Sequence, residues 1–171
     1  MNTIDQFSFL DKKAIIRVDF NVPLNNGEVT DNSRIVAASP TIKKIISDGG
    51  SCILMSHLGR PKGVDQSLSM GNIAKEVERV LGSEILLSKD VVGPDAKSKS
   101  KNLKPGKILL LENLRFHKEE TEGDVAFAEE LSKLADCYIN DAFGTAHRAH
   151  ASTTIIAQFF EHKFFGKLLE K

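Results

Sequence analysis

The segment AIIRV (14–18) is a run of apolar, mostly β-branched residues that only Arg17 interrupts. Apolar runs of this length are typical of parallel strands that are buried on both faces of a sheet. Similar runs follow along the chain, and together they predict strands over about 14–19, 51–56, 84–87, 107–111 and 137–140. Helix-like segments separate these runs. The alternation predicts an α/β fold: a doubly wound, Rossmann-like parallel sheet flanked by helices in three α/β/α layers, within a single domain.

The segments between the strands carry helix and turn signals. Apolar residues at helical spacing predict helices over 33–47, 70–81 and 124–135, with a lysine-rich surface helix or loop over 91–103. Ser33 is expected to cap the first helix, and Ser152 is expected to cap a final one. The polar stretch 23–33 contains the turn signal Asn26-Gly27 and predicts a hairpin-like excursion. The stretch 112–124 is expected to be an acidic loop.

The composition argues against several classes of function. Lys and Arg total 23, as do Asp and Glu, so the formal net charge is zero. Nucleic-acid-binding domains usually carry a clear basic excess, so no nucleic-acid partner is expected. Cys52 and Cys137 lie inside apolar runs and are interpreted as small buried hydrophobic residues. Because no signal peptide and no apolar stretch near ~20 residues is found, no membrane is expected and the chain is predicted to be cytoplasmic.

Polar and cationic residues follow the ends of four predicted strands. Asp19 and Asn21 follow the first strand, and cationic side chains lie beyond the strand ends at Arg34, His57, Arg60, Arg115 and Arg148. Ligands of open α/β sheets bind outside the carboxyl ends of the strands, and guanidinium groups suit carboxylates and phosphates. The sequence therefore predicts one pocket for a small polyanion, assembled from four loops.

Several of these residues also have a purely structural interpretation. An Asp-x-Asn pair such as Asp19 and Asn21 commonly forms a turn, and Arg34 could be a solvated surface residue. Arg115 could pair with the acidic run 119–124. Arg17, inside the first strand, is expected to be a buried counter-ion for a neighbouring acid rather than a ligand contact.

The loop HLGRPKG (57–63) is a more specific signal. Glycine at position 59 permits a left-handed turn, so that His57 and Arg60 can face the same space, as in an oxyanion or phosphate clamp. A plain connecting loop is the alternative. A metal-binding role for His57 is disfavoured because no second histidine or cysteine lies at ligand spacing.

Common catalytic motifs are absent from the sequence. It has no GxxxxGK[ST] loop, no GxGxxG after a strand, no serine nucleophile elbow and no cysteine in an exposed electropositive loop. No evident base or covalent nucleophile is therefore present. A site that binds anions and stabilises charge fits phosphoryl transfer, in which positioning and electrostatics do most of the work.

Four long motifs in register resemble the N-terminal domain of the phosphoglycerate kinase family: RVDFNVPL (17–24), SHLGRPKG (56–63), LLLENLRFHKEE (109–120) and YINDAFGTAHRAHAST (138–153). The resemblance runs from about residue 15 to 153. It implies a glycolytic enzyme that transfers a phosphoryl group between 1,3-bisphosphoglycerate and ADP, giving 3-phosphoglycerate and ATP. In that family the N-terminal domain binds 3-phosphoglycerate.

The resemblance also implies roles for individual residues. Asp19 and Asn21 would contact the hydroxyl and carboxylate end of the ligand, and Arg34 would be the catalytic arginine that stabilises the phosphoryl group in flight. His57, Arg60, Arg115 and Arg148 would form a basic patch that binds the substrate. Arg60, Arg115 and Arg148 would mainly bind its phosphate. The implied substrate-binding set is Asp19, Asn21, Arg34, His57, Leu58, Gly59, Arg60, Arg115 and Arg148. His147 could be structural.

One departure from the family pattern is large, because the second domain, with its glycine-rich nucleotide site and magnesium ligand, is absent. Residues 1–171 are thus expected to form an isolated N-terminal domain that is inactive alone, without cofactor or metal of its own. Mg-ADP or Mg-ATP would bind to the missing C-terminal domain, the partner of this chain in a parent enzyme that is expected to be a monomer. The Phe- and Leu-rich tail 159–169 would then be surface meant for the missing half.

Three alternatives remain open at this point. The tail could instead be a C-terminal helix docked on its own core. The chain could be a stand-alone anion-binding or regulatory module that uses the same pocket without catalysis. It could also be an interaction domain that oligomerises through the tail.

Overall fold

The computed structural model describes residues 2–142 and 149–167. Among them, the main sheet has seven strands, and every pairing between neighbouring strands is parallel. In spatial order these strands are β1 (Asn2–Thr3), β9 (Lys163–Phe165), β8 (Cys137–Asp141), β2 (Lys13–Val18), β5 (Ser51–Met55), β7 (Ile108–Leu110) and β6 (Ile85–Leu87). The predicted α/β class and all five predicted strands are confirmed.

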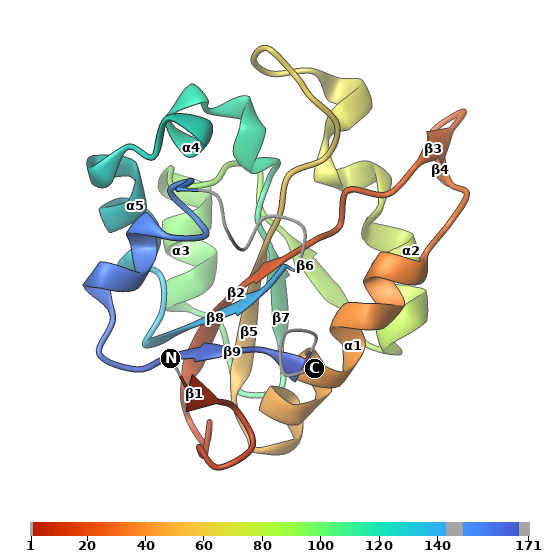
Figure 1. Cartoon of the computed structure of the whole chain (residues 1–171). Coiled ribbons are helices and arrows are strands. Elements are labelled where there is room, and N and C mark those ends of the chain that lie inside the picture. Colours follow the sequence, from red (N-terminus) through yellow and green to blue (C-terminus); the bar gives the residue numbers. More distant parts are fainter. Residues whose placement is uncertain (1, 143–148, 168–171) are drawn as a thin grey trace.

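Helices cover both faces of the sheet (Figure 1). On one face lie α1 (Ser33–Ser47) and α2 (Ala74–Leu81), and on the other lie α3 (Pro94–Lys101) and α5 (Val125–Ser132). Because successive side chains of a strand point to opposite faces, neighbouring residues of β2 join different cores. Ile16 packs in the cluster with Ile42 of α1, whereas Ile15 packs in the cluster with Leu131 of α5. The fold is thus the three-layer sandwich that the alternation predicts.

The chain reverses its winding direction at the centre of the sheet. β2 pairs with β5 on one side and with β8 on the other. The connection from β2 to β5 runs through α1, while the connection from β7 to β8 runs through α5 on the opposite face. The switch point therefore lies between β2 and β8, and ligands of such sheets bind outside the carboxyl ends of the strands there.

Local signals account well for the first half of the chain. The predicted hairpin consists of β3 (Leu24–Asn25) and β4 (Glu28–Val29), joined by Asn26 and Gly27, which both have positive φ. Helix 33–47 matches α1. The predicted helix 70–81 is a 3₁₀ turn, η2 (Met70–Asn72), followed by α2, which ends at the left-handed Gly82.

Two predicted helix caps are wrong. The residue preceding α1 is Asn32, and its side chain makes no cap hydrogen bond but donates from Nδ2 to Glu76 Oε2 of α2 at 2.8 Å. Ser152 begins no helix either. It is fully buried, and the following 3₁₀ helix η5 (Ile155–Phe159) starts after Thr154. The Ser33 hydroxyl donates to Asp31 Oδ1, two residues away, whereas the Asn32 and Ser152 side chains make tertiary contacts.

The stretch 112–124 is more ordered than an acidic loop. It contains the 3₁₀ helix η3 (Leu114–Phe116) and the short helix α4 (Lys118–Glu122). The lysine-rich stretch 91–103 contains α3, where Lys97 and Lys99 pair with Glu130 and Asp95 on the surface. Within the described residues, no helix is long and apolar enough to cross a membrane.

Within the aromatic tail 159–169, Lys163–Phe165 form the strand β9. β9 lies between β8 and β1, and the Phe164 ring packs against Phe7 and Phe9 with centroids 4.7 and 5.7 Å apart. Phe160 and Phe164 are buried. The expectation that the tail exposes its apolar residues is wrong for these two, and Leu168 and Leu169 lie outside the described residues. A three-residue strand is too short to show a periodicity.

Both cysteines are free and buried, as predicted. Cys52 of β5 and Cys137 of β8 lie opposite Ala14 on either side of β2. Two strand spacings, about 10 Å, separate them, which is too far for a disulfide. Burial raises the pKa of Cys137 to about 12 and raises that of Cys52 as well. The two thiols therefore act as core residues.

Candidate functional site

The first part of the site joins the end of β2 to the start of α1. Arg34, in the first turn of α1, donates from Nη1 to Asp19 Oδ1 at 3.2 Å and to the Asn21 carbonyl at 2.9 Å. The Arg34 side chain remains 53% exposed, so its guanidinium is still accessible from solvent. The Asn21 amide also donates to Asp19 Oδ1 at 3.1 Å, which is the turn that an Asp-x-Asn pair commonly forms. The turn interpretation of this pair is therefore confirmed, while the Asn21 side chain remains available for a further contact.

The loop after β5 is tied to the loop after β2. The Gly59 amide donates to Asn21 Oδ1 at 2.8 Å, and Gly59 has the predicted left-handed conformation, with φ of +64°. A Cβ at this position would lie 2.8 Å from Leu68 Cδ2, so a larger residue would also have to displace the Leu68 side chain. Arg60 follows directly and is exposed. The turn thus brings Leu58, Gly59 and Arg60 to the same edge as Asp19 and Asn21.

A buried asparagine, Asn113, connects the loops after β5 and β7. Its Oδ1 accepts from the amides of Leu58 at 3.3 Å and Arg115 at 3.0 Å, and its Nδ2 donates to the carbonyls of Leu58 at 2.8 Å and Leu68 at 2.9 Å. Asn113 was not among the site residues predicted from the sequence. A carboxamide in the loop just beyond the predicted strand 107–111 was the available signal.

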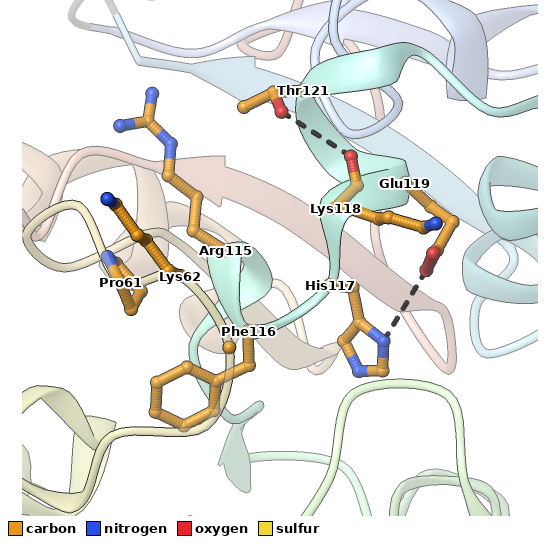
Figure 2. A pocket seen from close by; sticks show the side chains of 9 residues that line it. Pro61, Lys62, Arg115, Phe116, His117, Lys118, Glu119 and Thr121 are labelled. Carbon is orange, nitrogen blue, oxygen red and sulfur yellow. Dashed lines mark hydrogen bonds and ion pairs between the residues drawn. The ribbon is translucent and has the colours of Figure 1, made fainter.

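Arg115 lines an open cavity of about 460 Å³ between the 57–63 loop and α4. Figure 2 shows its guanidinium on the same side as Lys62 and turned away from Glu119. Glu119 Oε2 instead lies 3.8 Å from His117 Nδ1. Within the acidic run 119–124, Glu119 therefore pairs with His117 and Glu120 pairs with Arg17.

His57 differs from the prediction in its charge. It is only 5% exposed, and its Nδ1 lies 2.8 Å from Arg17 Nη2. Burial, reinforced by Arg17 and Arg115, lowers the pKa of His57 from an ordinary value to about 2. His57 is thus neutral near pH 7, and its inclusion among the cationic groups is wrong. The positive charge among the described site residues comes from Arg34, Arg60, Arg115 and Lys62.

The expectation that Arg17 is a buried counter-ion of a neighbouring acid is confirmed. Its guanidinium is completely buried, and Nε lies 4.0 Å from Glu120 Oε2. Ser152 bridges the pair: its Oγ accepts from Arg17 Nε at 2.8 Å and donates to Glu120 Oε2 at 2.5 Å. Burial lowers the pKa of Arg17, while Glu120 opposes that shift. Neither Glu120 nor Ser152 was predicted as a partner of Arg17; Glu120 resembles a solvated residue because it lies within an acidic run.

The loop after β8 is described only in part. Arg148 and His147 lie outside the described residues. His150, from the same motif, acts on the pKa of His57 together with Arg34 and Arg115. Residues that follow three other strands, β2, β7 and β8, therefore act electrostatically on the buried imidazole that follows β5. Among the described residues, no cluster of His, Cys, Asp and Glu side chains could hold a metal ion.

Comparison with protein families gives one assignment for nearly the whole chain. The phosphoglycerate kinase family profile matches residues 4–171. The chain belongs to the phosphoglycerate kinase family. It corresponds to the N-terminal region of that family, as the four motifs indicate.

Relatives and solved structures of the phosphoglycerate kinase family agree with this assignment. The phosphoglycerate kinase of Moorella thermoacetica is 52% identical over 170 residues, covering 99% of this chain and 43% of that protein. That of Porphyromonas gingivalis is 50% identical over 196 residues, covering 99% and 47%. The crystal structure of the Pyrococcus horikoshii enzyme superposes with a TM-score of 0.90 at 32% identity, over 99% of this chain and 43% of that one. The Coxiella burnetii structure gives 0.87 at 34% identity, over 98% and 42%.

This chain spans less than half of the length of the phosphoglycerate kinases it matches. The fold and the family follow directly from these comparisons. The substrate, the reaction and the role of each site residue are matters of proposal.

Proposed function

We propose that this chain is the 3-phosphoglycerate-binding half of a phosphoglycerate kinase. The reaction is phosphoryl transfer between 1,3-bisphosphoglycerate and ADP, giving 3-phosphoglycerate and ATP. One observation carries the proposal: loops from separate strands converge at the switch point of the sheet, where Arg34 already contacts Asp19 and the Asn21 backbone. The choice of substrate and reaction rests on membership of the phosphoglycerate kinase family.

The proposed roles follow from the donors and acceptors that each residue offers. Asp19 and Asn21 can accept from and donate to the hydroxyl and carboxylate end of the substrate. Arg60, Arg115 and Arg148 are proposed to bind its phosphate, since guanidinium forks match phosphate oxygens in pairs. Leu58 and Gly59 place the loop that presents Arg60.

Arg34 is proposed as the catalytic residue. Phosphoryl transfer is accelerated mainly by positioning and by stabilising charge on the transferred group. The Arg34 guanidinium is anchored by two hydrogen bonds from Nη1 and remains half exposed. Its Nη1 is therefore held by Asp19 and Asn21, while the exposed part of the guanidinium is accessible to the transferred group.

The remaining parts of the active site are proposed to lie in the C-terminal half, the partner of this chain in the enzyme. The relatives are more than twice as long as this chain, and the magnesium nucleotide is proposed to bind in the portion that this chain does not span. We therefore expect the 171-residue chain to show no turnover with ATP and 3-phosphoglycerate. Clear kinase activity of the chain alone would contradict this part of the proposal, while leaving substrate binding intact.

Substrate binding is tested by titration calorimetry with 3-phosphoglycerate at low ionic strength. We expect weak binding to the wild type and loss of the heat in an Arg60→Ala, Arg148→Ala double variant. A Lys101→Ala, Lys104→Ala variant removes the same charge at the opposite end of the sheet and should bind like the wild type. Equal heats from all three proteins would refute the proposed patch. A natural protein of only this mass would favour the stand-alone anion-binding module.

A further inference from the structure

The hydrogen bond between Arg17 and His57 determines where the proton of His57 lies. A guanidinium group has five N–H donors and no acceptor. Arg17 Nη2 lies 2.8 Å from His57 Nδ1, so Nδ1 must be the acceptor of this bond. A neutral imidazole that accepts at Nδ1 carries its proton on Nε2.

The guanidinium that imposes this tautomer is itself held in place. Arg17 Nε donates to Ser152 Oγ, and Nη1 donates to the Val18 carbonyl. The carboxylate of Glu120 lies 4.0 Å from Nε, and both side chains are fully buried. Since all three guanidinium nitrogens have partners, the group cannot turn away from His57 without leaving buried polar atoms unsatisfied.

The charges around His57 act in the same direction. Arg17, Arg115, Arg34 and His150 all oppose a positive charge on the imidazole. Glu120 lies on the far side of Arg17, where it compensates the guanidinium. A second proton on His57 would therefore be repelled by each of these groups. On Nδ1, it would also displace the Arg17 donor.

We infer that Arg17 is a positioning residue that holds His57 as the neutral Nε2–H tautomer, so that His57 offers one fixed hydrogen-bond donor to the anion site instead of a charge. Arg17 acts through His57 and need not touch the substrate. A fixed neutral donor has a consequence for binding: His57 takes up no proton when an anion arrives. The binding part of this inference rests on the proposed function, while the tautomer does not.

The test is nitrogen-15 NMR of the histidine rings in the uniformly labelled 171-residue chain without ligand. We expect His57 to show an unprotonated Nδ1 and a protonated Nε2, unchanged between about pH 8 and about pH 5. A protonated Nδ1, or titration of His57 within this range, would overturn the inference. Because no ligand is present, failure of the proposed substrate would leave this result unaffected.

Two variants separate positioning from folding. Arg17→Met combined with Glu120→Gln removes both buried charges together, so no unpaired ion remains. In this variant we expect His57 to lose its single tautomer, with Nδ1 protonated in part of the molecules, because no donor faces Nδ1 any longer. Ser100→Ala removes a buried hydroxyl of α3 whose bond to the Lys97 carbonyl lies outside this network, and it should retain the wild-type tautomer. An unchanged His57 spectrum in the double variant would overturn the inference, and if that variant does not fold, the wild-type spectrum still decides the tautomer.

Binding of 3-phosphoglycerate provides the functional measurement. In the double variant we expect the affinity to weaken by about tenfold or more, because the imidazole can then carry its proton on Nδ1 and no longer presents a fixed donor. Ser100→Ala should show the wild-type affinity. Wild-type affinity in the double variant would overturn the functional part, whereas absence of binding to the wild type would refute the proposed function instead.

Discussion

His57 lies 2.8 Å from the Arg17 guanidinium and is almost fully buried, so adding a proton to it costs free energy in the folded chain. Its pKa is lowered to about 2 by burial and by Arg17, whereas an unfolded chain has a histidine pKa of about 6.5. As the pH falls below about 6.5, the unfolded state therefore binds a proton that the folded state refuses. The folded state loses stability over this range, by at most about 1.4 kcal/mol per pH unit from this group.

This linkage gives a pH-dependent prediction. His57→Gln removes the titrating group, so its free energy of unfolding should fall by about 1 to 2 kcal/mol less than that of the wild type between about pH 7 and about pH 5. Urea unfolding at the two pH values measures the difference. His162→Gln, at an exposed histidine, should follow the wild type. Identical pH dependence in His57→Gln and wild type would contradict the burial argument.

Gly59 is the residue whose replacement should affect both stability and binding. Gly59→Ala places a side chain at φ of +64°, 2.8 Å from Leu68. Gly82→Ala has nearly the same φ, +67°, with no atom within 4 Å, so it isolates the conformational cost of about 1 kcal/mol. We expect Gly59→Ala to cost more than Gly82→Ala in urea unfolding and to weaken 3-phosphoglycerate binding, which Gly82→Ala should not affect. Equal unfolding costs would mean that Leu68 moves freely.

At the scale of elements, the loops after β5 and β7 are held together by one side chain. Asn113 is fully buried and makes four hydrogen bonds to the backbone of both loops. The two loops carry Arg60 and Arg115, so their spacing depends on this residue. The parallel sheet places the strand ends side by side, and Asn113 sets how the polar loops pack above them.

Removing this link should cost a large fraction of the stability. Asn113→Ala leaves buried backbone groups without partners, and we expect a loss of about 3 kcal/mol in the free energy of unfolding. Asn102→Ala removes an exposed side chain that bonds to the Ser98 carbonyl and should cost less than about 1 kcal/mol. Urea unfolding of the three proteins gives both values. A loss below 1 kcal/mol for Asn113→Ala would show that water replaces its bonds.

At the scale of the whole molecule, segments from opposite ends of the chain meet at one edge of the sheet (Figure 1). β9 pairs with β8 on one side and with β1 on the other. Phe164 of β9 is 6% exposed and packs against Phe7 and Phe9 from the N-terminal segment. The sheet edge is therefore completed only when both segments are in place.

Truncating the central side chain of this edge tests its contribution. Phe164→Ala should lower the free energy of unfolding by about 3 kcal/mol, because it empties a buried aromatic site. Phe165→Ala, at the adjacent and more exposed position on the same strand, is the matched control and should cost clearly less. Both are measured by urea unfolding. Equal losses would indicate that the strand, and not the Phe164 contact, carries the stability.

Local sequence patterns were sufficient for the layers of this fold. Apolar runs such as 14–18 identify the strands, helical spacing identifies α1, and Gly82 and Asn26-Gly27 mark turns through backbone conformations that few residues adopt. Arg34, Gly59 and Asn21 could be selected as site residues because the carboxyl ends of parallel strands share one edge. These features depend on neighbours within a few positions in the chain.

Other features depended on contacts between residues far apart in the chain, and only the tertiary structure decided them. The neutrality of His57 comes from its burial and from Arg17, 40 positions away, and the buried carboxylate of Glu120 accepts a hydrogen bond from Ser152, 32 positions away. β9 forms a strand because β8 and β1 offer it an edge. The charge of a side chain and the pairing of a short strand are set by the surrounding dielectric and hydrogen-bond partners, which exist only once the chain has folded.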